Sequence, residues 1–282
     1  MLLVADSGAT KTAWILLDKD NYPREFSTMG FTPMFHSEQD ILIALGGNGG
    51  LSEWADKVSE LRYFGSGCSS HDRIAKMHRA LQAFFANATV HIEHDLLGSV
   101  LATCGHTSGI SCILGTGSNA CFYDGQQIHE GVPSLDYILG DEGSGAYFGK
   151  KLIAKFLYKQ LPAALHNAFY AQYQIDKETA LNKVYKTPNP KAWLAGFSKF
   201  LRENIDHPYI SNFIFEGLEE FVQTQILVFP NHREVPVHFV GSIAYHFQTI
   251  LNEVCKKYQI TVGKIIQEPI YELADYVKTK KI

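Results

Sequence analysis

Cysteine is scarce in this sequence, and its placement excludes several kinds of site. The 282 residues include five cysteines: Cys68, Cys104, Cys112, Cys121 and Cys255. Their number is odd, and no pair has the C-x-x-C spacing of metal or redox motifs. We therefore expect reduced thiols that pack as small apolar side chains in a cytoplasmic protein.

The sequence also lacks an excess of charge and a long apolar run. Its formal net charge is -4 and it has no long basic stretch, which argues against nucleic acid as a partner. No apolar run approaches the roughly 20 residues that span a bilayer, so we expect no membrane segment. The first apolar run reaches Asp6 too early for the core of a secretory signal.

What the sequence does contain is a glycine-rich turn between two apolar runs. Residues 111–124 read as a strand, the turn Gly115-Thr-Gly-Ser118, and a second strand. Glycines allow the backbone to turn tightly and to approach a ligand closely. Successive N–H groups in such a turn can hold phosphate oxygens, and Thr116 and Ser118 add hydroxyl donors. The plainer alternative is a β-hairpin that binds nothing.

The same pattern begins the chain. Residues 2–18 again read as an apolar strand, a small polar turn from Asp6 to Thr12, and an apolar strand. Two such hairpins, far apart in the chain, suggest one half-fold used twice. Either hairpin alone fits a simple glycine turn, but the pair favours a nucleotide whose phosphates both turns hold.

The order of the expected elements indicates an α/β protein of two domains. A length of 282 residues with 46% hydrophobic residues suits two domains with sizeable cores. Each half should hold three hairpin strands followed by alternating helices and strands. We predict domains at 1–107 and 108–282, with a helical insertion at about 162–228. A terminal helix at 269–280 is a candidate to pack across the domain junction.

Five short segments occur in an order that resembles one known family. They are Asp6-Ser-Gly-Ala-Thr-Lys-Thr12, His94-Asp95, Leu114-Gly-Thr-Gly-Ser-Asn119, Gly140-Asp-Glu-Gly-Ser144 and Val240-Gly-Ser242. This set resembles the BadF/BadG/BcrA/BcrD ATPase family, and within it the N-acetylglucosamine kinases of the actin, sugar kinase and Hsp70 superfamily. The resemblance covers nearly the whole chain and weakens in the second half. It implies two ribonuclease-H-like domains with a central cleft that holds ATP and Mg2+, and an ATP-dependent kinase whose substrate is an amino sugar.

The resemblance also implies roles for individual residues. Asp95 matches the aspartate that acts on the sugar hydroxyl, and Asp6 lies near the magnesium ion in the family's pattern. The positions that match ATP-binding residues are Gly8, Thr10, Lys11, Thr116, Gly117, Gly241 and Ser242. The positions that match sugar-binding residues are Thr32, Ser118, Asn119 and Asp141.

The acidic positions have chemistry that suits these roles, and each also has a structural alternative. A carboxylate where a strand meets a helix, as at Asp95, can accept the proton of an attacking hydroxyl, but aspartate there is also a common helix N-cap. Asp6 can anchor Mg2+ or form a strand-end turn. Asp141 can hold sugar hydroxyls and Glu142 can reach magnesium through water, or both can be acids at the positive end of a helix.

The sequence departs from the family's pattern on the sugar side. The kinases usually have an asparagine in the loop that corresponds to Phe31-Thr-Pro33, and this chain has Thr32. They commonly carry Gly-Trp-Gly before Gly-Asp-Glu-Gly-Ser, where this chain reads Ser134-Leu-Asp136. An aromatic platform for the sugar is therefore lost or moved, while the phosphate segments are intact.

Two other functions fit parts of the sequence. Some relatives in the family are ATPase activators that pass electrons from an iron–sulfur cluster to a dehydratase. Such a cluster needs thiolate ligands, whereas Cys112 and Cys121 fall inside expected strands. The altered sugar-side residues also fit a non-catalytic sugar or nucleotide sensor. We consider a homodimer as an assembly, and expect no nucleic acid or membrane partner.

Overall fold

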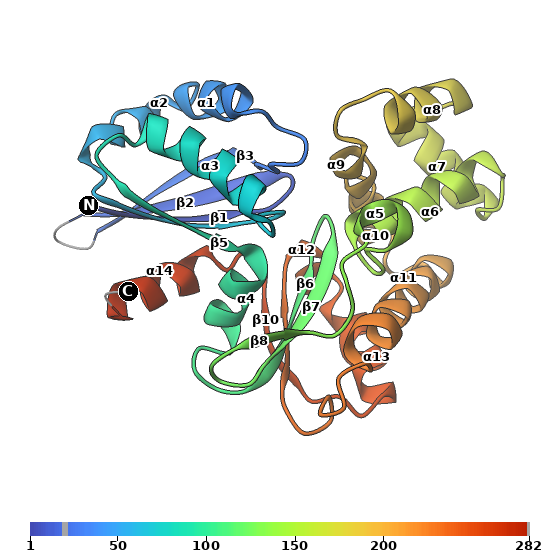
Figure 1. Cartoon of the computed structure of the whole chain (residues 1–282). Helices are drawn as coiled ribbons and strands as arrows, with labels where there is room; N and C mark the ends of the chain where they lie inside the picture. The colour runs from blue at the N-terminus through green and yellow to red at the C-terminus, as the bar shows by residue number, and fades with distance from the viewer. Residues whose placement is uncertain (19–21, 281–282) are drawn as a thin grey trace. The chain divides into compact units, whose positions relative to one another are not determined.

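The chain folds into two compact units. The computed structural model describes residues 1–18 and 22–280 (Figure 1). Unit 1 comprises Met1–His106 and Glu268–Ile282, and unit 2 comprises Thr107–Gln267. The predicted second domain, 108–282, therefore differs from unit 2, because the last segment of the chain returns to unit 1. Its final two residues lie outside the described part of the chain.

Unit 1 contains a mixed sheet of five strands. Their order is β3 (Pro23–Met29), β2 (Lys11–Leu17), β1 (Leu2–Ser7), β4 (Glu60–Gly65) and β5 (Thr89–His94). The first three strands are antiparallel, and β1, β4 and β5 are parallel. Leu3 and Trp14 belong to one buried cluster, and Val4 and Ile15 belong to another. Because successive side chains point to opposite faces, both faces of this sheet are covered.

Helices cover the two faces of the unit 1 sheet. The helices α1 (Glu38–Gly46), α2 (Gly49–Ser52) and α3 (His71–Phe84) lie on one side, and α4 (Asp95–Thr103) and α14 (Ile270–Lys280) lie on the other (Figure 1). Ile270, Leu273 and Val277 form an apolar stripe on α14 that packs with Val4 and Ile15. The terminal helix therefore packs within unit 1, because its stripe completes the second buried face of that sheet.

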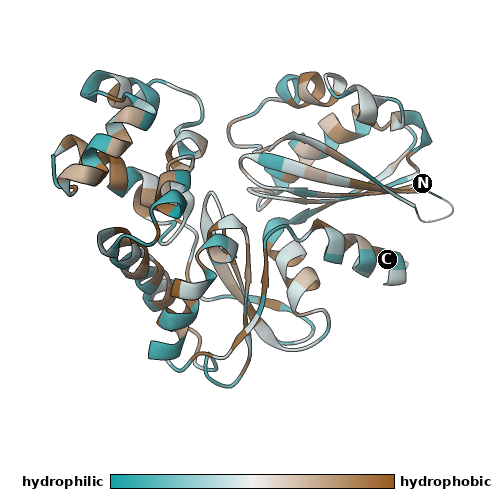
Figure 2. Cartoon of the chain, turned by 180° about the vertical axis from the view of Figure 1, so that it is seen from behind, coloured by the Kyte–Doolittle hydropathy of each residue, from teal (hydrophilic) through white to brown (hydrophobic). Residues whose placement is uncertain are grey.

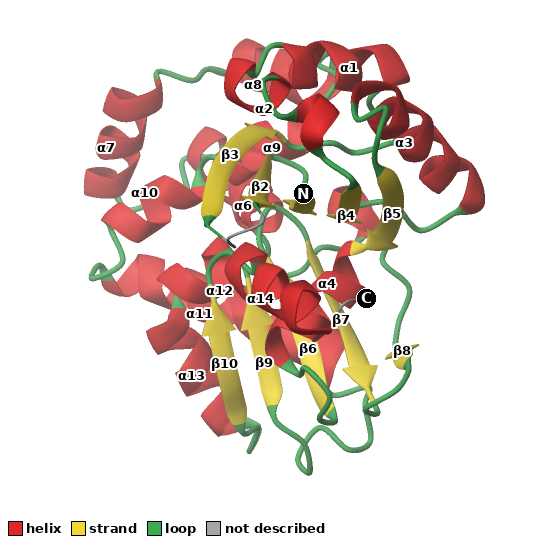
Figure 3. Cartoon of the chain, turned by 90° about the vertical axis from the view of Figure 1, so that its left-hand side faces the viewer, coloured by secondary structure: helices red, strands yellow, loops and turns green. Residues whose placement is uncertain are grey.

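Unit 2 repeats the sheet of unit 1. Its strand order is β10 (Val262–Ile266), β9 (Val237–Val240), β6 (Gly109–Leu114), β7 (Ser118–Tyr123) and β8 (Ile128–Glu130). Figure 3 shows β10, β9, β6 and β7 side by side. Again the first three strands of the unit are antiparallel, and the first, fourth and fifth are parallel. The half-fold expected from the two glycine hairpins is therefore present twice.

The helices of unit 2 surround a core rich in phenylalanine. These helices are α5 (Asp136–Leu139), α6 (Gly145–Leu157), α7 (Ala163–Tyr173), α8 (Lys177–Tyr185), α9 (Pro190–Ala195), α10 (Ser198–Glu203), α11 (Pro208–Phe221), α12 (Ser242–His246) and α13 (Gln248–Lys257). Phe148, Phe169, Phe200 and Phe221 are fully buried, and Figure 2 shows hydrophobic stretches on the strands. Within the described residues, no helix is long and apolar enough to cross a membrane.

One helix of the inserted region packs on α6 through backbone contact. A Cβ atom at Gly149 of α6 would overlap the carbonyl of Leu194 in α9. The first helical residue of α6, Gly145, faces Ala195 in the same way, since an added Cβ would lie 3.0 Å from the Ala195 Cβ. The position of α9 on α6 therefore depends on these glycines.

We predict that Gly149→Ala lowers the free energy of unfolding by about 1–3 kcal/mol, because α6 and α9 must move apart. The matched control is Gly46→Ala in α1, where an added Cβ meets no heavy atom within 4 Å. Alanine there should leave stability unchanged or raise it by up to about 1 kcal/mol. Chemical denaturation followed by tryptophan fluorescence reports the difference, since Trp193 lies on α9. Equal midpoints for the two variants would contradict the close packing of α6 and α9.

Candidate functional site

The parallel strands of unit 1 end at a common edge that carries acidic side chains. Asp6, near the end of β1, pairs with Phe64 of β4, and Gly65 pairs with His94 of β5. Asp95 follows directly as the first residue of α4. The carboxyl ends of parallel strands are where open α/β sheets present ligand-binding groups. The fold thus brings Asp6 and Asp95 to one edge.

Asp6 lies in a setting that disfavours its negative charge. Burial is the largest cause that raises the pKa of Asp6 to about 7, and the charges of Asp95 and Glu268 add to the rise. Lys11 opposes it. A carboxylate that is poorly solvated and close to other acids gains stability from a proton or from a cation.

This setting fits a magnesium ion that keeps part of its water shell. In the described part of the chain, no three His, Cys, Asp or Glu side chains are close enough to enclose a metal ion. Magnesium usually retains several waters and binds through one or two carboxylates and substrate phosphates. Asp6 can supply one such carboxylate. Glu142, the other predicted metal residue, belongs to unit 2.

The turn that follows Asp6 is shaped by a glycine from another segment. The N–H of Gly8 donates to the carbonyl of Lys11 at 3.0 Å, and the N–H of Gly30 donates to the carbonyl of Thr10 at 2.9 Å. A Cβ atom at Gly30 would overlap the backbone of residues 8–10. Gly30 therefore supports the predicted phosphate turn. Sequence reasoning missed this role, because the segment around Gly30 reads only as a break between elements.

Lys11, predicted to lie near phosphates, forms an ion pair at the start of β2. Its Nζ lies 3.1 Å from both carboxylate oxygens of Glu268. Both side chains are about half exposed (49% and 44%), so the pair contributes little to stability and can exchange partners. Glu268 was missed by sequence reasoning, because no local motif links two residues so far apart in the chain.

Asp95 lies at the start of α4 but does not cap it. The N-cap is His94, whose Nδ1 lies 3.2 Å from the N–H of Leu96 and 2.8 Å from Oδ1 of Asp95. The two contacts are alternatives, because Nδ1 accepts from Leu96 without a hydrogen and donates to Asp95 with one. The carboxylate of Asp95 keeps 21% of its surface exposed. The structural alternative for Asp95, a helix N-cap, is therefore wrong, and His94 has that role.

Thr32 lies in a loop that packs against the end of β4. Its N–H donates to Nδ1 of His36 at 3.1 Å. A Cβ atom at Gly67 would be in ordinary contact with Cγ2 of Thr32, at 3.5 Å. The next residue, Cys68, has a pKa raised to about 12, mainly by burial and further by Asp95. Thr32 and Asp95 thus flank the same loop.

The second glycine turn, in unit 2, is tied to the start of α6. The N–H of Gly145 donates to the carbonyl of Gly115 at 2.8 Å, and the N–H of Ala146 donates to the carbonyl of Thr116 at 3.1 Å. Gly241 has a φ of 120°, and a Cβ atom there would overlap the carbonyl of Leu114. Only glycine fits this close approach. The predicted residues Thr116, Gly117 and Gly241 are therefore brought together at the carboxyl ends of β6 and β9.

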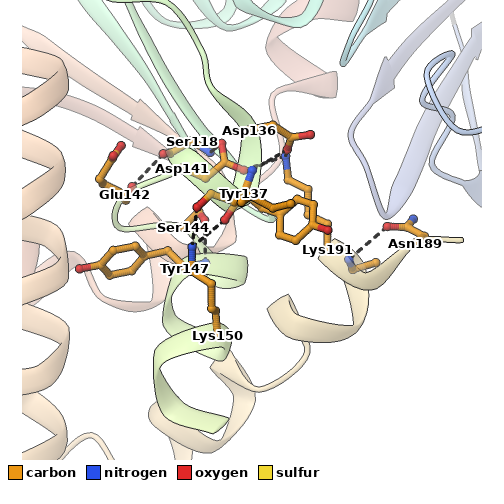
Figure 4. Close-up of polar contacts among 12 residues, drawn as sticks. Ser118, Asp136, Tyr137, Asp141, Glu142, Ser144, Tyr147, Lys150, Asn189 and Lys191 are labelled. Carbon is orange, nitrogen blue, oxygen red and sulfur yellow. Dashed lines mark hydrogen bonds and ion pairs between the residues drawn. The ribbon is translucent and has the colours of Figure 1, made fainter. Parts of the chain in front are cut away.

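The acidic loop before α6 is joined to the same turn. The backbone N–H of Ser118 donates to Oδ1 of Asp141 at 3.1 Å, and the Ser118 hydroxyl donates to the carbonyl of Glu142 at 2.8 Å (Figure 4). Asp141 is only 4% exposed and has a φ of 58°, a conformation that non-glycine residues rarely adopt. Burial raises the pKa of Asp141, while Lys191 and the Ser118 N–H act in the opposite direction.

Lys191 is the cation of this cluster, and sequence reasoning missed it. Its Nζ donates to Oδ1 of Asp136 at 2.6 Å and lies 2.8 Å from Oδ2 of Asp141 (Figure 4). Lys191 belongs to α9, whose N-cap Asn189 and first residue Pro190 mark a regular helix start. Its position in the inserted region, far from every motif, left no local signal.

Three predicted residues of unit 2 are less closely joined to this cluster. Oδ1 of Asn119 accepts the N–H of Ala120 at 2.9 Å. Oε2 of Glu142 is buried and accepts no hydrogen bond from the described residues. Ser242 is exposed at the start of α12. Within the described residues, the side chains of Asn119 and Glu142 form no hydrogen bond with Asp141.

No family model and no curated protein matches the chain. Among solved structures, a "putative N-acetylglucosamine kinase" of Porphyromonas gingivalis matches with 33% identity and a TM-score of 0.93, over 100% of both chains. Another of that description, from Chromobacterium violaceum, matches with 17% identity and a TM-score of 0.71, over 98% of both chains. A ROK family glucokinase of Streptomyces griseus, solved in complex with glucose and AMPPNP, matches with 14% identity and a TM-score of 0.57, over 99% of both chains. The last two matches show the fold, that of actin-like sugar kinases. At 33% identity over the whole of both chains, the protein belongs to the same family as the Porphyromonas gingivalis protein.

Proposed function

We propose that this protein is an ATP-dependent kinase that phosphorylates a hydroxyl group of an amino sugar, N-acetylglucosamine or a close relative. We assign it, more finely, to the N-acetylglucosamine kinases of the BadF/BadG/BcrA/BcrD family. The observation that carries the proposal is the edge of unit 1, where Asp6 and Asp95 meet beside a glycine turn. The family relationship with the Porphyromonas gingivalis protein supports it.

ATP is held in this proposal by the two glycine turns. Gly8, Thr10 and Lys11 bind phosphate oxygens from unit 1, and Thr116 with Gly117 does so from unit 2. The residues that approach the adenosine are Gly241 and Ser242. Lys11 then exchanges Glu268 for phosphate, which the exposure of their ion pair allows.

Asp6 is the first proposed ligand of the metal ion. When bound there, Mg2+ would neutralise charge that develops during phosphoryl transfer. Asp6 supplies one carboxylate directly or through water, and Glu142 is the second candidate. The acidic surroundings of Asp6 favour such a cation.

Asp95 is the proposed catalytic base. It accepts the proton of the sugar hydroxyl while the oxygen attacks the γ-phosphorus of ATP, and ADP leaves. The partial exposure of the Asp95 carboxylate permits this contact. His94 orients the carboxylate through its contact at 2.8 Å.

The sugar is held by Thr32 from unit 1 and by Ser118, Asn119 and Asp141 from unit 2 in this proposal. Ser118 acts indirectly, since its hydroxyl and N–H are bonded to the acidic loop. Asp141 keeps a negative charge beside the glycine turn through its ion pair with Lys191. The charged oxygens of Asp141 can accept hydrogen bonds from sugar hydroxyls.

The competing functions have less support. All five cysteines are buried, whereas an iron–sulfur activator needs thiolates that can reach a cluster. A sugar or nucleotide sensor would not require a base at the strand edge, where the fold presents Asp95. A kinase needs no accessible thiolate, and it does need a base such as Asp95.

We predict that Asp95→Asn lowers kcat by about 10²- to 10⁴-fold, because asparagine cannot accept the hydroxyl proton. The affinity for MgATP should remain within about threefold of the wild-type value, because Asp95 touches the sugar in this account. A coupled ADP assay with N-acetylglucosamine and a nucleotide-binding titration measure the two effects. Asp72→Asn, a fully exposed change on α3, is the control. Normal turnover by Asp95→Asn would remove Asp95 from catalysis.

The raised pKa of Asp6 predicts how nucleotide affinity depends on pH. Since Asp6 titrates at about 7 in the ligand-free protein, affinity for Mg·AMPPNP should increase as pH rises through about 7 and the carboxylate ionises. The Asp6→Asn variant should bind Mg·AMPPNP more weakly, and its affinity should lose this dependence on pH. Comparison of the two proteins also corrects for titration of the nucleotide itself, because that titration is common to both. An Asp6→Asn profile parallel to the wild-type one would assign the titration to another group.

The same pKa makes a prediction for the ligand-free protein. The native state of Asp6 holds its proton up to a pH of about 7, whereas the unfolded state loses it near the ordinary value of 3.8. Asp6 therefore destabilises the native state increasingly as pH rises from about 4 to about 7. Asp6→Asn should raise Tm more at pH 8 than at pH 4, measured by thermal denaturation without nucleotide. An equal change at both pH values would contradict the raised pKa.

The contact of Gly30 with the first turn predicts a loss of nucleotide binding. Gly30→Ala should weaken MgATP binding roughly tenfold, because the added methyl must displace residues 8–10. Gly49→Ala is the matched control, since a Cβ at Gly49 meets no heavy atom within 4 Å. Calorimetric titration gives both affinities. An unchanged affinity in Gly30→Ala would show that this turn does not hold the nucleotide.

A further inference from the structure

Lys191 occupies a position built for a cation. Its Nζ lies 2.6 Å from Oδ1 of Asp136 and 2.8 Å from Oδ2 of Asp141 (Figure 4). The Asp141 side chain is only 3% exposed and that of Lys191 15%. A carboxylate so deeply buried needs a positive partner. The three side chains together carry two negative charges and one positive charge.

The backbone around this position is held in place from several sides. Asp136 and Asp141 both have positive φ, at 59° and 58°, a conformation that surrounding structure must maintain. Lys150 of α6 donates to the carbonyl of Tyr137 at 2.7 Å and so holds α5. Gly149 allows α9 to pack directly on α6. The backbone at both aspartates is therefore held by contacts that do not involve the lysine.

This cation position borders the glycine turn of unit 2. A Cβ atom at Gly117 would lie 2.7 Å from Nζ of Lys191 and 2.9 Å from Oδ2 of Asp141. The lysine amine thus covers a residue that the proposed function assigns to ATP, beside one that it assigns to the sugar. A lysine has three N–H donors, and Asp136 and Asp141 are its two partners among the described residues.

We propose that Lys191 is a specificity-determining residue, which fills the cation position between Asp136 and Asp141 so that the kinase accepts an N-acylated amino sugar and rejects the free, protonated amine. This inference rests on the proposed function and names the substrate class for it. The third N–H of Lys191 donates to the acyl oxygen of the substrate. The ammonium group of a free amino sugar would lie beside the lysine's positive charge, and Nζ already occupies the position between the two carboxylates. Lys191 therefore discriminates between the two sugars in two ways: it attracts the acyl oxygen of one and repels the ammonium group of the other.

The test is a change of preference on removal of the lysine. In Lys191→Met, the ammonium group of glucosamine can take the vacated position between the two carboxylates. The ratio of kcat/KM for N-acetylglucosamine to kcat/KM for glucosamine should fall at least tenfold, with a gain on glucosamine in absolute terms. Lys191→Arg keeps the charge and should keep the wild-type preference.

The matched control and a binding readout separate this effect from general damage. Lys199→Met removes an exposed lysine of the neighbouring α10, whose side chain is 61% exposed, and should leave the ratio unchanged. Glucosamine should raise the Tm of Lys191→Met and leave that of the wild type unchanged. If Lys191→Met does not fold, Lys191→Met/Asp136→Asn replaces it, because this pair of changes retains the wild-type net charge. It should still lose most of the preference, since the repelling amine is gone.

The outcomes distinguish the inference from the function on which it rests. A wild-type enzyme that phosphorylates N-acetylglucosamine, with the same ratio in Lys191→Met and Lys199→Met, would overturn the role of Lys191 and leave the kinase intact. A wild-type protein that phosphorylates neither sugar would overturn both. A higher kcat/KM for glucosamine in Lys191→Met, and not in Lys199→Met, supports both the role of Lys191 and the kinase function.

Discussion

Close backbone contact at glycine shapes both candidate phosphate turns. In unit 1, Gly30 lies against residues 8–10, and in unit 2, Gly241 lies against the carbonyl of Leu114. Either contact would be lost with any side chain at these positions. The conformation of each turn is thus set by a neighbouring segment as well as by its own sequence. A turn held in this way can keep its N–H groups aimed at phosphate before the ligand arrives, which is what electrostatic preorganisation requires.

The buried carboxylates of the two units differ in whether a cation of the chain neutralises them. At the edge of unit 1, Asp6 lies near Asp95 and Glu268, and Lys11, which opposes their effect, is about half exposed. Burial, with the charges of Asp95 and Glu268, raises the pKa of Asp6 and favours a cation from outside the chain. In unit 2, the buried Asp141 already has its cation in Lys191. This difference suits a cation at Asp6 and sugar hydroxyls at Asp141.

Much of this architecture could be predicted from the sequence, and the failures have a common cause. The glycine turns are predictable because apolar strands flank Gly8 and Gly117 directly in the chain. Asp95 is predictable as a strand-end carboxylate, but the choice between base and helix cap is not, because His94 competes for the cap. Contacts between distant segments leave no local pattern. This applies to Glu268, to Lys191 in the insertion and to α14, whose apolar stripe has no sequence signal for the sheet that it covers.

The most direct test of the account is transfer of labelled phosphate from [γ-32P]ATP to N-acetylglucosamine by the wild-type protein. The account predicts one labelled sugar phosphate for each ADP formed, with little ADP formed when the sugar is omitted. ADP release without label on the sugar, or no transfer to any amino sugar, would contradict it.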